Sequence, residues 1–235
     1  CPHAAIRMKI VEPEALAGMP EGFRSKPFRS HDHPGLSLVI QVVPDDCTGC
    51  GVCVDVCPAK SKTDVGHKAI NMAPYLDHRD VERERWSTFE TIPQLDRTLV
   101  PRETVKGAAL LEPLFEFSGA CAGCGETPYI RLASQLFGDR MLVANATGCS
   151  SIYGGNLPTT PYSKNAEGQG PTWANSLFED NAEFGLGMRL ALDAQQALAQ
   201  MLVTQLREKI GPELADALLG APQDNDEQIK VQRTR

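Results

Sequence analysis

Residues 47–58 read CTGCGVCVDVCP, and this run of cysteines constrains the chain more tightly than any other stretch. Four cysteines stand in the spacing C-x2-C-x2-C-x3-C, and Pro58 follows the last of them. This spacing is typical of bacterial ferredoxins, in which three thiolates bind one 4Fe-4S cluster and the fourth binds the neighbouring cluster. The run therefore predicts a loop that wraps an iron-sulfur cluster.

Cys1 is also followed by a proline, so it has the appearance of the last cysteine in an earlier copy of the same run. By the crossing rule, Cys1 completes one cluster with Cys47, Cys50 and Cys53, whereas Cys57 serves a second cluster. The other ligands of that second cluster would lie outside this sequence. Because the opening motif is cut and the last residues are polar, we expect a chain truncated at both ends.

Cys121, Cys124 and Cys149 form a third group, which needs one more thiolate from beyond the chain to hold a third 4Fe-4S cluster. Zinc remains an alternative, mainly for Cys121 and Cys124, where a redox dithiol also competes. Disulfides fit poorly, because they belong to oxidising compartments and the chain has no signal-peptide pattern.

The composition is that of a globular protein with an acidic balance. Apolar residues make up 42%, and 23 basic and 30 acidic side chains give a net charge of -7. This balance argues against nucleic acid as a partner. No stretch approaches the roughly 20 apolar residues of a membrane span. Free thiolates and exposed clusters are oxidatively labile, so we expect a reducing, low-oxygen cytoplasm.

Hydrophobic patterns predict several regular elements. A β-branched run favours a strand at residues 36–43, and apolar positions at helical spacing predict helices over 127–137 and 181–210, the latter a packing helix. A short strand is expected at 141–144, which gives the second half of the chain an α/β pattern. The segment 77–102 is dense in charge and holds two prolines, which favours a linker or surface strap.

These patterns divide the chain into three regions. Residues 1–76 predict an α+β ferredoxin-type domain, truncated at its start and with an insertion between its two cysteine motifs. Residues 77–116 are predicted to form a linker, and residues 117–235 an α/β domain. Within the last region, residues 145–161 are rich in glycine, serine, threonine and proline, as expected of a binding loop at a strand end.

Four segments together resemble one family. They are CPHAAIR at 1–7, CTGCGVCVDVCPAK at 47–60, FSGACAGCGETPYIRLASQLFGDRM at 117–141 and ATGCSSIYGGNLPTTPY at 146–162. This text is similar to the pyruvate:ferredoxin (flavodoxin) oxidoreductases, which are large thiamine diphosphate enzymes, and the resemblance covers nearly the whole chain. It implies a partial α+β two-cluster ferredoxin-like domain followed by the N-terminal part of an α/β thiamine diphosphate-binding domain.

The resemblance implies an enzyme that oxidatively decarboxylates pyruvate with coenzyme A, giving acetyl-CoA and carbon dioxide. Electrons would pass through three 4Fe-4S clusters, one of which has a complete ligand set here, to ferredoxin or flavodoxin. The full-length enzyme would be a cytoplasmic homodimer of anaerobic metabolism. This chain by itself is expected to be inactive, and no catalytic residue is assigned to it.

The resemblance also assigns cofactor contacts. Glu126 matches a position that contacts thiamine diphosphate, and the loop around Cys149 lies against the same cofactor. The ligands of Mg²⁺ and the fourth ligand of the third cluster fall outside this chain. From local sequence alone, Glu126 would be interpreted as a solvated acidic residue at the start of a helix.

Three other interpretations stay open. The substrate could be another 2-oxo acid, because the residues that select it would lie outside this sequence. The cysteines could belong to a stand-alone 4Fe-4S electron-transfer module, although a plain carrier would not need the second half of the chain. A structural zinc protein is the last alternative, and metal analysis separates it from the others.

Overall fold

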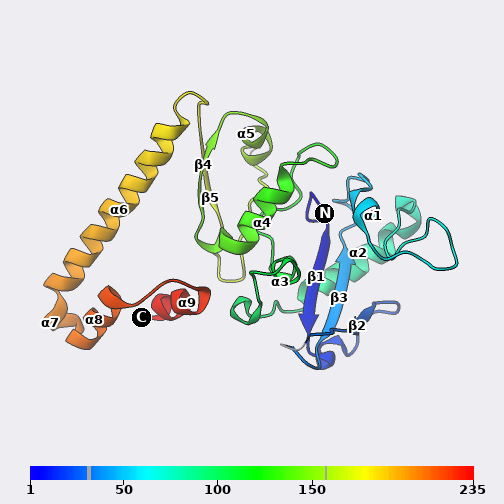
Figure 1. Cartoon of the computed structure of the whole chain (residues 1–235), viewed down its shortest axis with the longest axis horizontal. Coiled ribbons are helices and arrows are strands. Elements are labelled where there is room, and N and C mark those ends of the chain that lie inside the picture. Colours follow the sequence, from blue (N-terminus) through cyan, green and yellow to red (C-terminus); the bar gives the residue numbers. More distant parts are fainter. Residues whose placement is uncertain (31–32, 157) are drawn as a thin grey trace. The chain divides into compact units, whose positions relative to one another are not determined.

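The computed structural model describes residues 1–30, 33–156 and 158–235. The contacts within the chain divide it into two compact units, whose elements are labelled in Figure 1. Unit 1 consists of residues 1–143 and 149–173, and unit 2 consists of residues 144–148 and 174–235.

A three-stranded antiparallel sheet lies within unit 1 (Figure 1). Its strands are β1 (Ile6–Val11), β2 (Ser25–Pro27) and β3 (Ser37–Val42), in the order β1-β3-β2. Strands β1 and β3 pair from Ile6 opposite Val42 to Val11 opposite Ser37. The strand predicted at residues 36–43 is confirmed as β3, the middle strand of the sheet.

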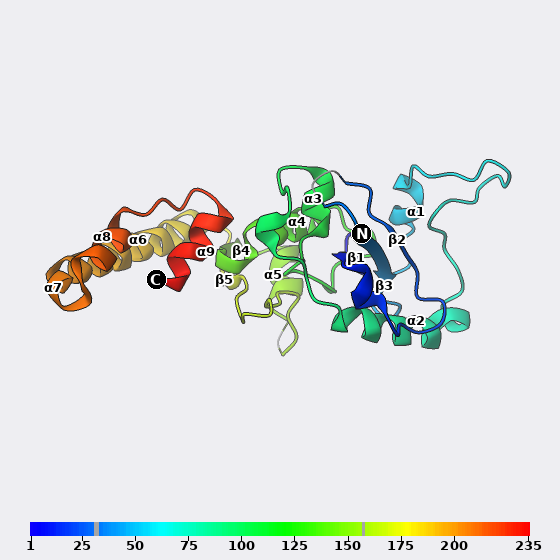
Figure 2. The same ribbon diagram turned by 90° about the horizontal axis from the view of Figure 1, so that it is seen from below.

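Successive side chains of β1 point to opposite faces of this sheet, and both faces are covered. On one face Ile10 lies in a core cluster with residues in or next to α3 (Val105–Leu110) and with others. The remaining buried members of that cluster are Phe28, Leu36, Val100, Leu110 and Leu111. On the other face Val11 and Val39 pack with Phe89 of α2 (Tyr75–Thr91). Figure 2 shows α2 on one side of the sheet and α3 on the other.

Helix α2 corrects the prediction of a linker or strap at residues 77–102, because a helix of 17 residues occupies the first part of that segment. Both prolines of the segment come after the helix and therefore do not interrupt it. Its charges also suit a helix, since Arg85 pairs with Glu82 at a distance of 2.6 Å, one turn away. The apolar face is narrow and centres on Phe89, which is 3% exposed. A narrow apolar face explains why the sequence pattern does not reveal the helix.

Short elements connect the longer ones in unit 1. Helix α1 (Val52–Val56) lies inside the cysteine run. Lys60 and Lys68 form an isolated antiparallel bridge that closes a hairpin between α1 and α2. Three 3-10 helices stand at Pro13–Leu16, Arg97–Leu99 and Gly138–Arg140.

The α/β pattern predicted for the second half is present in a reduced form. Helix α4 (Thr127–Phe137) and strand β4 (Leu142–Ala146) confirm the predicted helix and strand, and β4 pairs with β5 (Thr172–Ser176) in a two-stranded sheet. The loop predicted at 145–161 is wrong in part, because α5 (Cys149–Gly154) forms within it. Leu157 of that segment lies outside the described residues.

Gly154 at the end of α5 allows this short helix to pack against Trp173. A Cβ atom at Gly154 would lie 3.0 Å from the ring of Trp173, so a larger residue would push the indole away. The run of small residues that favours a loop in the sequence therefore serves as the contact surface of a short helix.

Unit 2 contains four helices in its described residues: α6 (Asn181–Gln205), α7 (Arg207–Ile210), α8 (Pro212–Gly220) and α9 (Asp226–Thr234). The helix predicted at 181–210 is confirmed, with a break at Leu206. The sequence predicts that it packs through its apolar side chains, yet α6 buries no residue in the part of the chain that the structure describes. None of the described helices is long and apolar enough to cross a membrane. The domain limits at residues 76 and 116 stay predictions.

Candidate metal centre

The first cysteine run turns through two left-handed glycines. Gly49 and Gly51 have φ angles of 69° and 76°, which L side chains rarely adopt. Gly51 is also the N-cap of α1, so the chain passes directly from the turn into the helix. Cys47 is exposed, whereas the other three cysteines of the run are half-buried. The glycines therefore allow a compact loop that carries closely spaced thiols.

All eight cysteines are free thiols. The amino group of Cys1 lies near the run: burial and then the charge of Arg131 lower its pKa, while Cys53 and Cys50 act in the opposite direction. Within the described residues, no three histidine, cysteine, aspartate or glutamate side chains converge on a single metal ion. A 4Fe-4S cluster makes a different demand, because its four cysteines are distributed over four irons. The amino group of Cys1 lies near Cys50 and Cys53, and free cysteines are the donors that such a cluster needs.

Cys57 stands at the base of the hairpin. Backbone hydrogen bonds from Ala59, and then from Ile70 and Ala69, lower the pKa of the Cys57 thiol, and the charge of Lys68 acts in the same direction. The ammonium of Lys68 also donates to the carbonyl of Asp55 at 3.1 Å, which ties the hairpin to the end of α1. A lowered pKa favours the thiolate, which is the form that binds metal ions.

The loop of Cys121 and Cys124 lies directly against the first cysteine run. The amide of Cys124 donates to the carbonyl of Cys121 at 2.9 Å, and Gly123 between them has a φ of 72°. A Cβ atom at Gly123 would lie 3.5 Å from the Cβ of Cys50 and 3.6 Å from Val52, which is ordinary van der Waals contact. Two of the three predicted groups of ligands are therefore neighbours in unit 1.

His3 connects the start of the chain to the same loop. It is 2% exposed, and its Nε2 lies 3.2 Å from the carbonyl oxygen of Cys121. The amide of Phe117 donates to the carbonyl of His3 at 3.0 Å. Phe117 and Ala4 have φ angles of 51° and 57°, a strained conformation for residues other than glycine. Such strain persists where the surrounding contacts enforce it, so this junction is tightly determined.

Glu126 precedes α4 and lies next to two tyrosines. Burial raises the pKa of Tyr153, and the neighbouring Glu126 carboxylate raises it further. The same two causes raise the pKa of Tyr162 to about 12. The hydroxyls of Tyr153 and Thr127 are buried and have no hydrogen-bond partner of good geometry among the described residues. Glu126 is itself exposed at the start of α4, and its carboxylate lies beside buried hydroxyls that lack a partner among the described residues.

Helix α5 connects the remaining predicted ligand to this group. Cys149 is its first residue and is exposed, and Tyr153 stands one turn further along the same helix. Cys124 acts on the pKa of Tyr153 in the same direction as Glu126, so α5 lies beside the loop of Cys124. The role of Cys149 as a cluster ligand stays a prediction.

The motifs of the sequence do not point to His3 or Arg131. Tyr153 begins the run YGGN at 153–156, which follows Cys149 and is predicted to be a loop on the cofactor side. Arg131 is a cation among the apolar positions of the predicted helix at 127–137, and that contrast is a signal that could have found it. His3 carries no comparable signal, because its partner is 118 residues away.

The first cysteine run matches a known class of metal-binding sequence. Residues 1–61 match a family model described as a 4Fe-4S dicluster domain, and residues 39–85 match a second model with the same description. The first part of the chain is therefore a ferredoxin-like 4Fe-4S dicluster sequence, as its spacing predicts.

Similarity to characterised proteins extends over the whole chain. A pyruvate-flavodoxin oxidoreductase of Trichormus variabilis is 57% identical over 235 residues, which are 100% of this chain and 20% of the relative. A probable pyruvate-flavodoxin oxidoreductase of Escherichia coli is 52% identical over 99% of this chain and 20% of the relative. A pyruvate:ferredoxin oxidoreductase of Moorella thermoacetica is 54% identical over 83% of this chain and 16% of the relative.

Over nearly its whole length the chain is therefore similar to pyruvate-flavodoxin and pyruvate:ferredoxin oxidoreductases. It spans about a fifth of the length of the curated relatives it matches.

Proposed function

We propose that this chain is the part of a pyruvate-oxidising enzyme that conducts electrons from a thiamine diphosphate site to a flavodoxin or ferredoxin. The names of the relatives supply pyruvate and the two carriers, and the 4Fe-4S dicluster match supplies the conducting groups. The complete enzyme would convert pyruvate and coenzyme A to acetyl-CoA and carbon dioxide, as a homodimer in a reducing cytoplasm. Another 2-oxo acid is the alternative substrate.

The contact between Gly123 and Cys50 carries this proposal. It joins the loop of Cys121 and Cys124 to the ferredoxin-type run. When bound, 4Fe-4S clusters accept and release single electrons. A cluster held by Cys1, Cys47, Cys50 and Cys53 would lie beside one held by Cys121, Cys124, Cys149 and a ligand from outside the chain. Cys57 would serve the cluster on the hairpin side of the run.

The polar group around Glu126 supports a cofactor contact on the other side of that loop. Thiamine diphosphate, when bound, supplies the carbon nucleophile and electron sink for decarboxylation. The Glu126 carboxylate would accept a hydrogen bond from an amine of the cofactor, and the buried hydroxyls of Tyr153 and Thr127 are donors in need of a partner. Mg²⁺ would be held by residues outside this chain, as the resemblance implies.

Anaerobic reconstitution of the chain with iron and sulfide tests the proposal. We expect about four irons per chain and an EPR signal after reduction, because one ligand set is complete. Cys50→Ser should lose both the iron and the signal. Cys57→Ser is the matched control from the same run, and it should keep them, because Cys57 serves a different cluster. Stoichiometric zinc without sulfide or signal would contradict the proposal and indicate a structural metal site.

A further inference from the structure

Arg131 is a half-buried cation next to the predicted cluster ligand Cys1. It stands in α4, and its Nη1 donates to the carbonyl of Cys1 at 3.0 Å. Its Nε is buried and has no partner among the described residues. Burial lowers the pKa of this guanidinium, and no carboxylate acts to raise it. Arg131 also forms no ion pair in the part of the chain that the structure describes.

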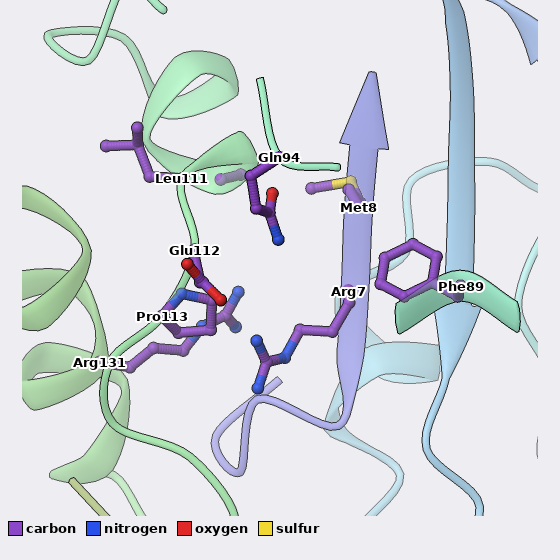
Figure 3. Close-up of a pocket in the computed structure, with 9 residues that line it drawn as sticks. Arg7, Met8, Phe89, Gln94, Leu111, Glu112, Pro113 and Arg131 are labelled. Atoms are coloured by element: carbon purple, nitrogen blue, oxygen red, sulfur yellow. The ribbon is translucent and has the colours of Figure 1, made fainter. Parts of the chain in front are cut away.

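Neighbouring charges leave the positive charge of Arg131 uncompensated. Figure 3 shows the side chains of Arg131 and Arg7 reaching toward each other beside Glu112. These residues line a cavity of about 20 Å³, room for roughly one water molecule. Arg7 has its own partner, because it forms an ion pair with Glu116. Burial raises the pKa of Glu112 against the charges of Arg7 and Lys9, and Glu112 forms no ion pair with Arg131 among the described residues.

A buried charge is costly unless an opposite charge or a dense set of hydrogen bonds compensates it. The guanidinium of Arg131 instead reaches the backbone of Cys1, a predicted cluster ligand. A 4Fe-4S cluster with four thiolate ligands carries net negative charge, and it gains one more when it is reduced. Net charge and hydrogen bonds around a cluster set its reduction potential. A fixed cation in a poorly solvated site stabilises the reduced form more than the oxidised form.

We propose that Arg131 is the counter-charge of the cluster held by Cys1, Cys47, Cys50 and Cys53, and that it raises the reduction potential of that cluster. This inference rests on the proposed function, which assigns those four ligands. Arg131 acts through its charge and through the Cys1 carbonyl, so it is a positioning and tuning residue. Helix α4, which carries Arg131, begins three residues after Cys124. A shift of the loop of Cys121 and Cys124 would therefore move Arg131 and change the reduction potential of the cluster held by Cys1, Cys47, Cys50 and Cys53.

The test is a redox titration of the reconstituted chain followed by EPR. Arg131→Gln keeps a donor for the Cys1 carbonyl but removes the charge, and we expect unchanged iron content and at least tenfold weaker reduction. That factor corresponds to a potential about 59 mV lower for one electron. Arg131→Lys keeps the charge, so its reduction potential should stay close to that of the unmodified chain. Arg24→Met removes an exposed cation of unit 1 and should leave both the iron content and the reduction potential unchanged.

Equal potentials for the unmodified chain and Arg131→Gln at equal iron content would overturn the inference. A low potential for both Arg131→Gln and Arg131→Lys would overturn it too, because the charge would then not be the cause. If Arg131→Gln does not hold iron, Arg131→Met takes its place in the comparison with Arg131→Lys. Failure of the unmodified chain to bind iron would instead defeat the proposed function itself.

Discussion

At the scale of single residues, Lys9 shows how a charge is accommodated in the core of unit 1. It is 5% exposed, and its Nζ donates to the carbonyls of Phe89, at 2.9 Å, and of Ile92 at the end of α2. A cation at this end of a helix is favoured by the helix dipole. Burial nevertheless lowers the pKa of Lys9 to about 8 from its usual 10.5. The fold therefore tolerates the charge at a cost.

That cost predicts that the difference in folding stability between the unmodified chain and Lys9→Met depends on pH. Below pH 8 both the folded and unfolded chains hold the proton, so the cost is constant. Between about pH 8 and 10.5 only the unfolded chain holds it, so the stability of the unmodified chain rises with pH by about 3 kcal/mol relative to the variant. Urea unfolding of both proteins at about pH 7 and pH 10 measures this. Thiol titration is common to both and cancels, and a flat or falling difference would count against the prediction.

Residue spacing in the sequence predicts the kind of metal site but not what surrounds it. The cysteines are recognisable because ligand spacing within one loop is a local property. The contacts of His3 with Cys121 and of Arg131 with Cys1 span 118 and 130 residues, and no local pattern reports such pairs. Glu126 is predicted by resemblance alone, and its neighbours Tyr153 and Tyr162 emerge only from tertiary packing.

At the scale of elements, α2 is the clearest test of the fold. Because Phe89 is the buried residue of this helix and packs on β3, we expect Phe89→Ala to destabilise unit 1 by about 3 to 5 kcal/mol. Leu76→Ala is the matched control in the same helix, since Leu76 is 74% exposed, and it should cost less than about 0.5 kcal/mol. Chemical unfolding of the two variants measures the difference. Equally small losses of stability in the two variants would instead favour the surface strap that the sequence predicts for this segment.

Elements with strong periodicity were predictable, and those fixed by tertiary contact were not. Strand β3 and helix α4 have the apolar spacing of their class, and both form where expected. Helix α2 is charged on most of its surface, so its stability comes from one narrow contact with the sheet. Helix α5 depends on the fit of Gly154 against Trp173, a contact that composition hides.

At the scale of the whole molecule, the two units differ in how much they bury. Val39 in β3 is fully buried, whereas Leu190 and Leu198 of α6 are 58% and 52% exposed. Amide hydrogens in poorly packed helices exchange through local opening, so α6 should exchange faster than β3. Hydrogen exchange followed by mass spectrometry at low protein concentration checks this order. Equal protection of α6 and β3 would show that the apolar side chains of α6 are covered in solution.

The contact between Gly123 and Cys50 also bears on how the protein would fail in air. The loop of Cys121 and Cys124 approaches Cys50 closely, so the two predicted clusters would be neighbours. Oxygen that destroys one cluster would free its thiolates to form sulfenic and sulfinic acids beside the other cluster. Oxidative damage would then spread from one site to the next, and inactivation would follow the more vulnerable of the two.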